Sequence, residues 1–234
     1  MDRDEMLARV RELRAKNTPP KVIARALGLR PADVGPLIKA VAEEVAASVP
    51  EPGVLQCWVS PNWCAGLTVK GHDEWPGVRD TGEAGSSGLV SIVVVREARR
   101  GRVSVCGYLV DVYCLGVKNA LGPKVMDPPA VPDFLRSYYR AYGEPLAAPL
   151  DLAQHLVFGA VEYARALGFE PHPDFAVAAG HLGSCTGPSV ITFGYHGKPL
   201  FMLGPNDNAA HVMRTLQRTV GEGNFQFVAG GTLG

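Results

Sequence analysis

The sequence predicts an α+β protein in which a small helical unit precedes a larger domain built on an antiparallel sheet. Three observations lead to this fold class. Apolar side chains recur at helical spacing within residues 1–48, two β-branched runs flank a charged turn within residues 89–115, and residues 150–167 form a long amphipathic helical pattern. The helices of the larger domain are expected to cover its sheet.

The bulk composition excludes several classes of protein. The chain has 234 residues, 47% of them hydrophobic, and its 23 basic and 23 acidic side chains give a formal net charge of zero. This balance argues against a surface that binds nucleic acid everywhere, although a local basic face is compatible with it. The acidic N-terminus does not resemble a signal peptide, and no apolar run is long enough to cross a bilayer, so no membrane association is expected.

Cysteine usage indicates the compartment. Five cysteines at irregular spacing match neither a zinc-binding pattern nor a disulfide framework. Reduced, mostly buried thiols in a cytoplasmic protein are therefore expected. These cysteines are Cys57, Cys64, Cys106, Cys114 and Cys185.

The N-terminal residues predict three helices in succession. The first covers Asp2–Lys16 and ends before the pair Pro19-Pro20, which opens the second helix. Gly28 can adopt the left-handed conformation that ends a helix, and Leu29 is expected to fill the corner that follows. The third helix then continues to about Ser48. Residues 1–48 hold nine Lys or Arg and seven Asp or Glu, a net charge of +2.

The pattern Ile23-Ala24…Leu27-Gly28-Leu29…Val34…Ile38 resembles the helix-turn-helix superfamily, which occurs in bacterial regulators and in sigma-factor or resolvase tails. The resemblance covers residues 3–47, about a fifth of the chain. It implies that the second helix of the pair lies in a DNA major groove. The side chains expected to meet phosphates or bases are Lys21, Arg25, Arg30 and Lys39.

The same segment departs from a strong base-reading helix. Small, apolar or acidic residues stand where Arg, Gln, Asn or Ser would normally reach base edges. These residues are Pro31, Ala32, Asp33, Gly35 and Pro36. A helical hairpin used for dimerisation or packing is therefore the alternative interpretation.

A Pro- and Gly-containing linker at 49–53 is expected to join this unit to the α+β domain at 54–234. Segment 54–87 is irregular and holds all three tryptophans. Further on, Leu89–Val95 and Val103–Leu115 predict a long antiparallel hairpin. The rest of the chain predicts three helices, at Asp133–Tyr142, Leu150–Leu167 and Asn208–Val220. Val190–Gly194 and Pro199–Leu203 are expected to pair as a hairpin whose turn is His196-Gly197. A last strand is expected at Asn224–Val228.

One set of residues in the larger domain could support acid–base or metal-dependent hydrolysis. Asp151, His155 and Glu162 share a stripe of the helix at 150–167, and the first two are one turn apart. Asp111 is a carboxylate on an otherwise apolar strand, which burial would penalise unless it were paired, for example with Lys118, or bound to metal. These four carboxylate and imidazole groups are the candidate catalytic residues. The alternatives are a solvated helix stripe and a structural or solvent-exposed aspartate.

A divalent metal is a second possibility. Asp207 and His211 repeat the one-turn spacing of a carboxylate and a histidine, and with His155 they could hold zinc, manganese or magnesium. No spacing matches an established zinc signature, and Asp207 could instead cap its helix.

The sequence thus favours a DNA-binding protein, a transcriptional regulator in which the α+β domain serves dimerisation or ligand sensing, so DNA and a second copy of the chain are the expected partners. A metal-dependent hydrolase or nuclease, delivered to nucleic acid by its helical unit, is the first alternative. A protein-interaction module without chemistry is the second.

Overall fold

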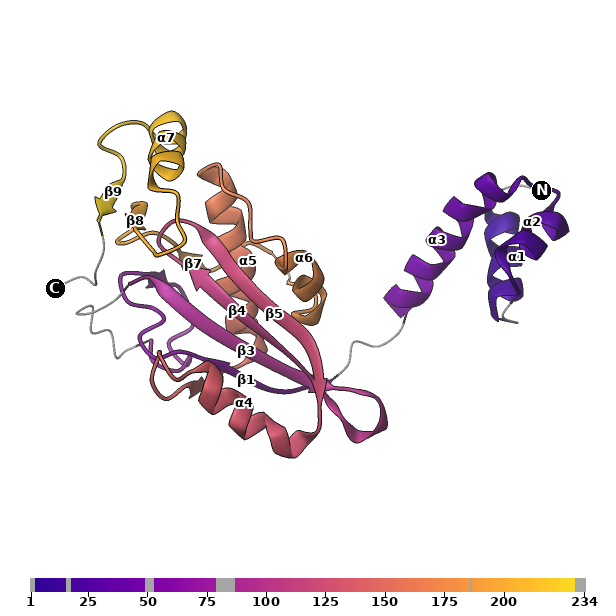
Figure 1. The fold of residues 1–234 in the computed structure, drawn as a ribbon, viewed down its shortest axis with the longest axis horizontal. Coiled ribbons are helices and arrows are strands. Elements are labelled where there is room, and N and C mark those ends of the chain that lie inside the picture. Colours follow the sequence, from indigo (N-terminus) through magenta and orange to yellow (C-terminus); the bar gives the residue numbers. More distant parts are fainter. Residues whose placement is uncertain (1–2, 16–17, 49–52, 79–86, 186, 230–234) are drawn as a thin grey trace. The chain divides into compact units, whose positions relative to one another are not determined.

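The computed structural model describes residues 3–15, 18–48, 53–78, 87–185 and 187–229 (Figure 1). The chain divides into two compact units, Met1–Glu51 and Pro52–Gly234. The predicted linker at 49–53 lies outside the described residues except for Gly53, and so does most of the Gly-rich loop that precedes Leu89. The α+β class predicted from the sequence is confirmed.

The first unit is a bundle of three helices. They are α1 (Arg3–Ala15), α2 (Pro20–Leu27) and α3 (Pro31–Ser48). Their core consists of five buried apolar residues, Val10, Ile23, Ala24, Val34 and Val41, surrounded by partly buried leucines and Ile38. The helical spacing of apolar residues predicts this core. The same spacing predicts that Val22 is buried, but Val22 is exposed over 51% of its surface.

A three-residue turn joins α2 to α3. Gly28 has φ +65°, and its N–H donates to the carbonyls of Ala24 and Arg25 at the end of α2. The Leu29 N–H donates to the Ala24 carbonyl at 2.9 Å, and the Leu29 side chain packs against the core. A left-handed glycine with these bonds is the usual way to end a helix and redirect the chain.

The second unit is built on a five-stranded antiparallel sheet of order β5-β4-β3-β1-β6. The centre of the sheet is apolar because β3 is almost entirely buried. The strands are β1 (Val54–Val59), β3 (Leu89–Glu97), β4 (Val103–Asp111), β5 (Gly116–Met126) and β6 (Leu146–Ala147).

Helices cover both faces of this sheet (Figure 1). On one face lie α5 (Leu150–Ala166) and α6 (Phe175–Ala178), with α5 burying Leu152, Leu156 and Ala160 against the main core. On the other face lies α4 (Val131–Tyr138), which packs with Val93, Val105 and their neighbours in a smaller core.

Shorter elements complete the second unit. β2 (Thr68–Val69) pairs antiparallel with β7 (Ile191–Thr192), whereas β8 (Leu200–Met202) pairs parallel with β9 (Gln226–Val228). Helix α7 (Ala209–Thr219) packs with Phe201 and the end of α5. Three single turns of 3₁₀-helix are η1 (Arg99–Gly101), η2 (Pro128–Ala130) and η3 (Ala179–His181).

Three sequence predictions in this unit are corrected. Segment 54–87, predicted to be irregular, begins with β1, which pairs with β3 and β6 in the main sheet. The strand predicted at 103–115 ends at Asp111, because its carboxylate accepts backbone N–H groups and starts a turn, and a second long strand, β5, follows. The hairpin predicted across His196-Gly197 is reduced to a single bridge between Tyr195 and Lys198, since β7 and β8 each pair with a strand distant in sequence.

The contact between β5 and α5 predicts a test of this packing. A methyl group on Gly116, at φ +68°, would lie 2.7 Å from the Ala164 Cβ and 2.9 Å from the Ala160 carbonyl oxygen. Gly101 has the same φ, +68°, and open space around it. Gly101→Ala should therefore lower the free energy of unfolding only by the backbone cost of about 1–2 kcal/mol. Gly116→Ala should cost about 1–3 kcal/mol more, measured by urea unfolding. Equal costs would contradict the close packing of α5 on the sheet.

Candidate functional sites

The four cations predicted to meet DNA lie on the surface of the first unit. Lys21 and Arg25 are one turn apart on α2, Arg30 immediately precedes α3, and Lys39 is in its third turn. All four residues are exposed. Both helices that flank the turn therefore carry positive charge, which is the requirement for contacts with a phosphate backbone.

One of these cations is held by a carboxylate. Nε of Arg30 donates to Oδ2 of Asp33 at 2.8 Å, and Nη2 donates to Oδ1 at 3.1 Å. Because the Arg30 and Asp33 side chains are exposed over 83% and 41% of their surfaces, the pair contributes little to stability. Its main effect is electrostatic, since Asp33 neutralises the cation nearest the start of α3.

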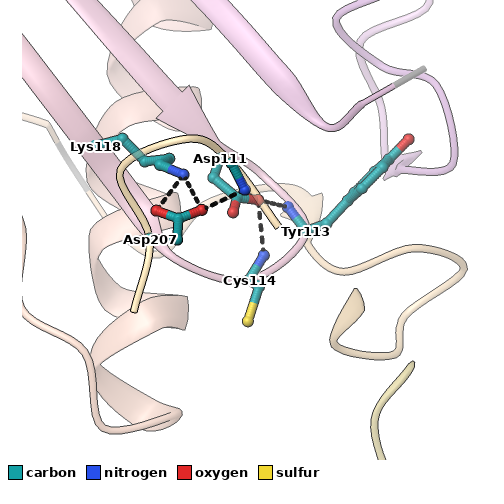
Figure 2. Close-up of polar contacts among 6 residues, drawn as sticks. Asp111, Tyr113, Cys114, Lys118 and Asp207 are labelled. Atoms are coloured by element: carbon teal, nitrogen blue, oxygen red, sulfur yellow. Dashed lines mark hydrogen bonds and ion pairs between the residues drawn. The ribbon is translucent and has the colours of Figure 1, made fainter. Parts of the chain in front are cut away.

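In the second unit, Asp111 is buried rather than exposed. Its side chain is at the end of β4, and the residue is 4% exposed. Oδ1 accepts the N–H groups of Tyr113 and Cys114 at 2.9 and 3.0 Å (Figure 2). Burial raises the pKa of Asp111 to about 6, against the opposing effects of the Tyr113 N–H and the Lys118 charge. Asp111 therefore fixes the turn between β4 and β5.

Lys118 forms its ion pair with Asp207 rather than with Asp111. Nζ donates to both carboxylate oxygens of Asp207, at 2.7 and 2.6 Å (Figure 2). The Gly204 N–H donates to Oδ2 at 2.8 Å. The two side chains are 19% and 9% exposed. This pair ties the start of β5 to the segment that leads into α7.

The same pair borders a groove of about 590 Å³. This volume falls in the range of small-molecule sites. Its lining combines apolar side chains with amides, imidazoles and the charged pair, so it could accommodate a ligand with both an apolar body and hydrogen-bonding groups. The lining residues besides Lys118 and Asp207 include Leu109, Leu115, Val117, Asn119, Phe169, Glu170, His172, Asn206 and His211.

The candidate catalytic residues of α5 lie elsewhere. His155 and Glu162 line a second groove of about 300 Å³ together with Cys185 and Ser189, and Asp151 is exposed on the first turn of α5. Burial lowers the pKa of His155, and the neighbouring His72 lowers it further, so the imidazole is biased to the neutral form. The pKa of the Cys185 thiol is raised by burial and by Glu162, which disfavours a thiolate nucleophile.

Asp111 does not join this group. It pairs in register with Gly116, which lies against Ala164 in the last turns of α5, whereas Asp151 is in the first turn. Residues 151 and 164 are separated by about 20 Å along a helix axis. The structure therefore places Asp111 and Asp151 at opposite ends of α5.

The three residues considered for a divalent metal are also divided. Asp207 and His211 line the larger groove, whereas His155 lines the smaller one. Within the part of the chain that the structure describes, no group of three or more His, Cys, Asp or Glu side chains could hold a metal ion. The Asp207 oxygens are instead bonded to Lys118.

Sequence reasoning missed a cluster of rings beside His155. His72 stacks on Trp75 with ring centroids 4.1 Å apart, and the ring centroids of Trp75 and His155 are 5.6 Å apart. His72 is also paired with Glu74, Nδ1 to Oε1 at 2.8 Å. The segment holding His72 and Trp75 shows no periodic pattern, so nothing local in the sequence connects it to α5.

No protein-family model, curated protein or solved structure matches this chain. Among the described helices, none is both long and apolar enough to cross a membrane.

The structural role of Asp111 predicts a pH-dependent stability difference. Because its pKa in the folded protein, about 6, exceeds the ordinary 3.8, the folded state gains stability as the pH falls through this interval. Asp111→Asn keeps an acceptor for the two N–H groups but removes the buried charge. The free energy of unfolding of the variant minus that of the wild type should be largest above pH 7. This difference should fall by up to about 3 kcal/mol between pH 7 and pH 4, because the wild type gains stability as Asp111 is protonated.

Urea unfolding of both proteins between pH 4 and pH 8 measures this difference. A stability difference that does not change with pH would contradict a buried, charged Asp111.

Proposed function

We propose that this protein binds duplex DNA through its N-terminal unit and regulates transcription. The observation that carries the proposal is the pair α2–α3, joined by a Gly28-Leu29 turn, with exposed cations on both helices. In a helix-turn-helix unit the first helix of such a pair crosses the DNA backbone and the second enters the major groove. Lys21 and Arg25 on α2 would then contact phosphates.

The second unit is proposed to sense a ligand or to mediate dimerisation. The groove beside Lys118 and Asp207 supports ligand binding, since it has the volume and mixed lining of a small-molecule site. Dimerisation is proposed because one helix-turn-helix unit with a net charge of +2 makes few phosphate contacts, and two copies can bind two half-sites. None of the five cysteines forms a disulfide, which supports a cytoplasmic location.

No observation favours the two alternative functions to the same degree. The residues considered for a hydrolase are distributed over two grooves and a buried turn. A protein-interaction module remains the contrasting hypothesis for the helical unit, and it differs in predicting no salt-dependent binding to duplex DNA.

Charge reversal on α2 tests the proposal in the full chain. Lys21→Glu with Arg25→Glu should weaken duplex binding about tenfold or more. The slope of log K against log salt should become less negative by about 1.8, because two phosphate contacts are lost. Fluorescence anisotropy at several salt concentrations measures both quantities.

The matched control places the same change on the second unit. Arg136 and Arg140 are exposed and have the same four-residue spacing. Reversing both should leave the affinity and slope unchanged. DNA binding that is equally sensitive to both pairs, or insensitive to the α2 pair, would contradict the proposed interface.

Releasing Arg30 from its carboxylate should strengthen binding. Asp33→Asn removes the negative charge that holds the guanidinium, so Arg30 can contact a phosphate. The slope of log K against log salt should then become more negative by up to about 0.9. Glu12→Gln on α1 is the control, since it releases Arg9 from a pair of the same spacing and changes the net charge equally. An equal increase in both variants would indicate a general charge effect rather than contact through Arg30.

A further inference from the structure

The outer side of α3 is unusual for a helix that contacts DNA. Successive residues of a helix are about 100° apart, which places Ala32, Pro36 and Lys39 opposite the inward-facing Val34 and its neighbours. Val34 is fully buried in the core of the unit, whereas Ala32, Pro36 and Lys39 are all exposed. The first two turns of α3 therefore present a methyl group and a pyrrolidine ring, and Lys39 follows in the next turn.

These two turns offer no side-chain hydrogen-bond donor. Residues 31–38 are Pro, Ala, Asp, Val, Gly, Pro, Leu and Ile. Asp33 is the only polar side chain among them, and it is engaged by Arg30. Guanine shows two acceptors, N7 and O6, in the major groove, and it is normally recognised by donors from Arg or Lys. Residues 31–38 therefore present no side-chain donor to the guanine acceptors.

The backbone of α3 adds one acceptor. Pro36 lies inside the helix and has no N–H, so the Ala32 carbonyl oxygen lacks the hydrogen bond that residue 36 would otherwise donate. Because the carbonyl of a helical residue is directed toward the residue four positions later, this oxygen lies on the same outer side as Pro36. An adenine presents an N6 amino donor in the major groove, and its thymine partner presents a C5 methyl group.

From these features we infer that the outer side of α3 recognises A·T base pairs in the major groove. The Ala32 methyl and the Pro36 ring contact thymine methyl groups, and the Ala32 carbonyl oxygen accepts from an adenine amino group. A cytosine amino group could also reach this oxygen, but a G·C pair lacks the methyl group and leaves the guanine acceptors unmatched. The exposed cations Lys21, Arg25 and Lys39 complement the phosphates beside the groove.

This inference rests on the proposed function, and one set of duplexes separates the two. The full chain is titrated with three duplexes of equal length: an A·T-rich one, the same duplex with every thymine replaced by deoxyuridine, and a G·C-rich one. Deoxyuridine lacks only the C5 methyl. We expect the A·T-rich duplex to bind most tightly, and deoxyuridine to weaken binding about fourfold for each buried methyl.

The possible outcomes are distinct. Salt-dependent binding of equal strength to all three duplexes would overturn the A·T inference and leave the proposed function in place. Salt-dependent binding that favours the G·C-rich duplex would do the same. If no duplex shows salt-dependent binding, both the inference and the proposed function fail.

A pair of alanine variants tests which surface makes the contact. Ala32→Arg places donors on the outer side of α3 and should shift the preference toward the G·C-rich duplex, because Arg pairs with guanine O6 and N7. Ala26→Arg adds the same charge at an exposed site on α2, and it should strengthen binding to all duplexes alike. The same shift in both variants would overturn the assignment of α3 as the recognition surface.

Discussion

The second unit depends on a buried carboxylate. Asp111 accepts two backbone N–H groups and thereby turns the chain from β4 into β5. The position of that turn sets the start of β5, and hence the position of Lys118, whose ammonium group holds Asp207. Through Gly204 and Asp207 the same contacts position the segment that leads into α7. Burying a charge is costly, so its two hydrogen bonds and the nearby Lys118 are what make this arrangement stable.

The groove at this end of the sheet follows from the same contacts. The charged pair lines it together with residues of β4, β5, the segment after α5 and the start of α7. Three regions that are distant in sequence, the β4–β5 hairpin, the segment after α5 and the start of α7, therefore meet at this groove. The Lys118–Asp207 pair holds the segment before α7 to β5, and the His172 N–H donates to the Val117 carbonyl at 2.9 Å. Under the proposed function, a ligand that contacts Lys118 or Asp207 would also contact the residues that hold the segment before α7.

The sequence predicted the parts of the fold that local patterns determine. The three N-terminal helices, the β3–β4 hairpin and α5 follow from apolar periodicity, and Gly28 marks the turn between α2 and α3. β5 escaped prediction because Gly122, Pro123 and Lys124 interrupt any alternation of apolar and polar residues. The parallel pairing of β8 with β9 is a contact between distant segments, which no local pattern specifies.

The candidate sites also divide into those that a local pattern determines and those that depend on contacts between distant residues. The exposed cations of α2 and α3 could be predicted because helix geometry alone determines which residues face outward. The partner of Lys118 could not, because Asp207 is 89 residues away in sequence. The approach of the stacked His72 and Trp75 rings to His155 was missed for the same reason, since His155 is 80 residues from Trp75 in sequence. For Asp111 the sequence identified a carboxylate on an otherwise apolar strand, while its burial and its role in the turn required the structure.

The proposed function assigns DNA contact to one unit and leaves the other for a ligand or a second copy. Its central claim concerns location, so the most direct measurement is hydrogen–deuterium exchange of the full chain with and without duplex DNA at low salt. The account predicts added protection confined to the α2–α3 region, residues 20–39. Protection confined to the second unit, or none at a DNA concentration that saturates binding, would contradict it.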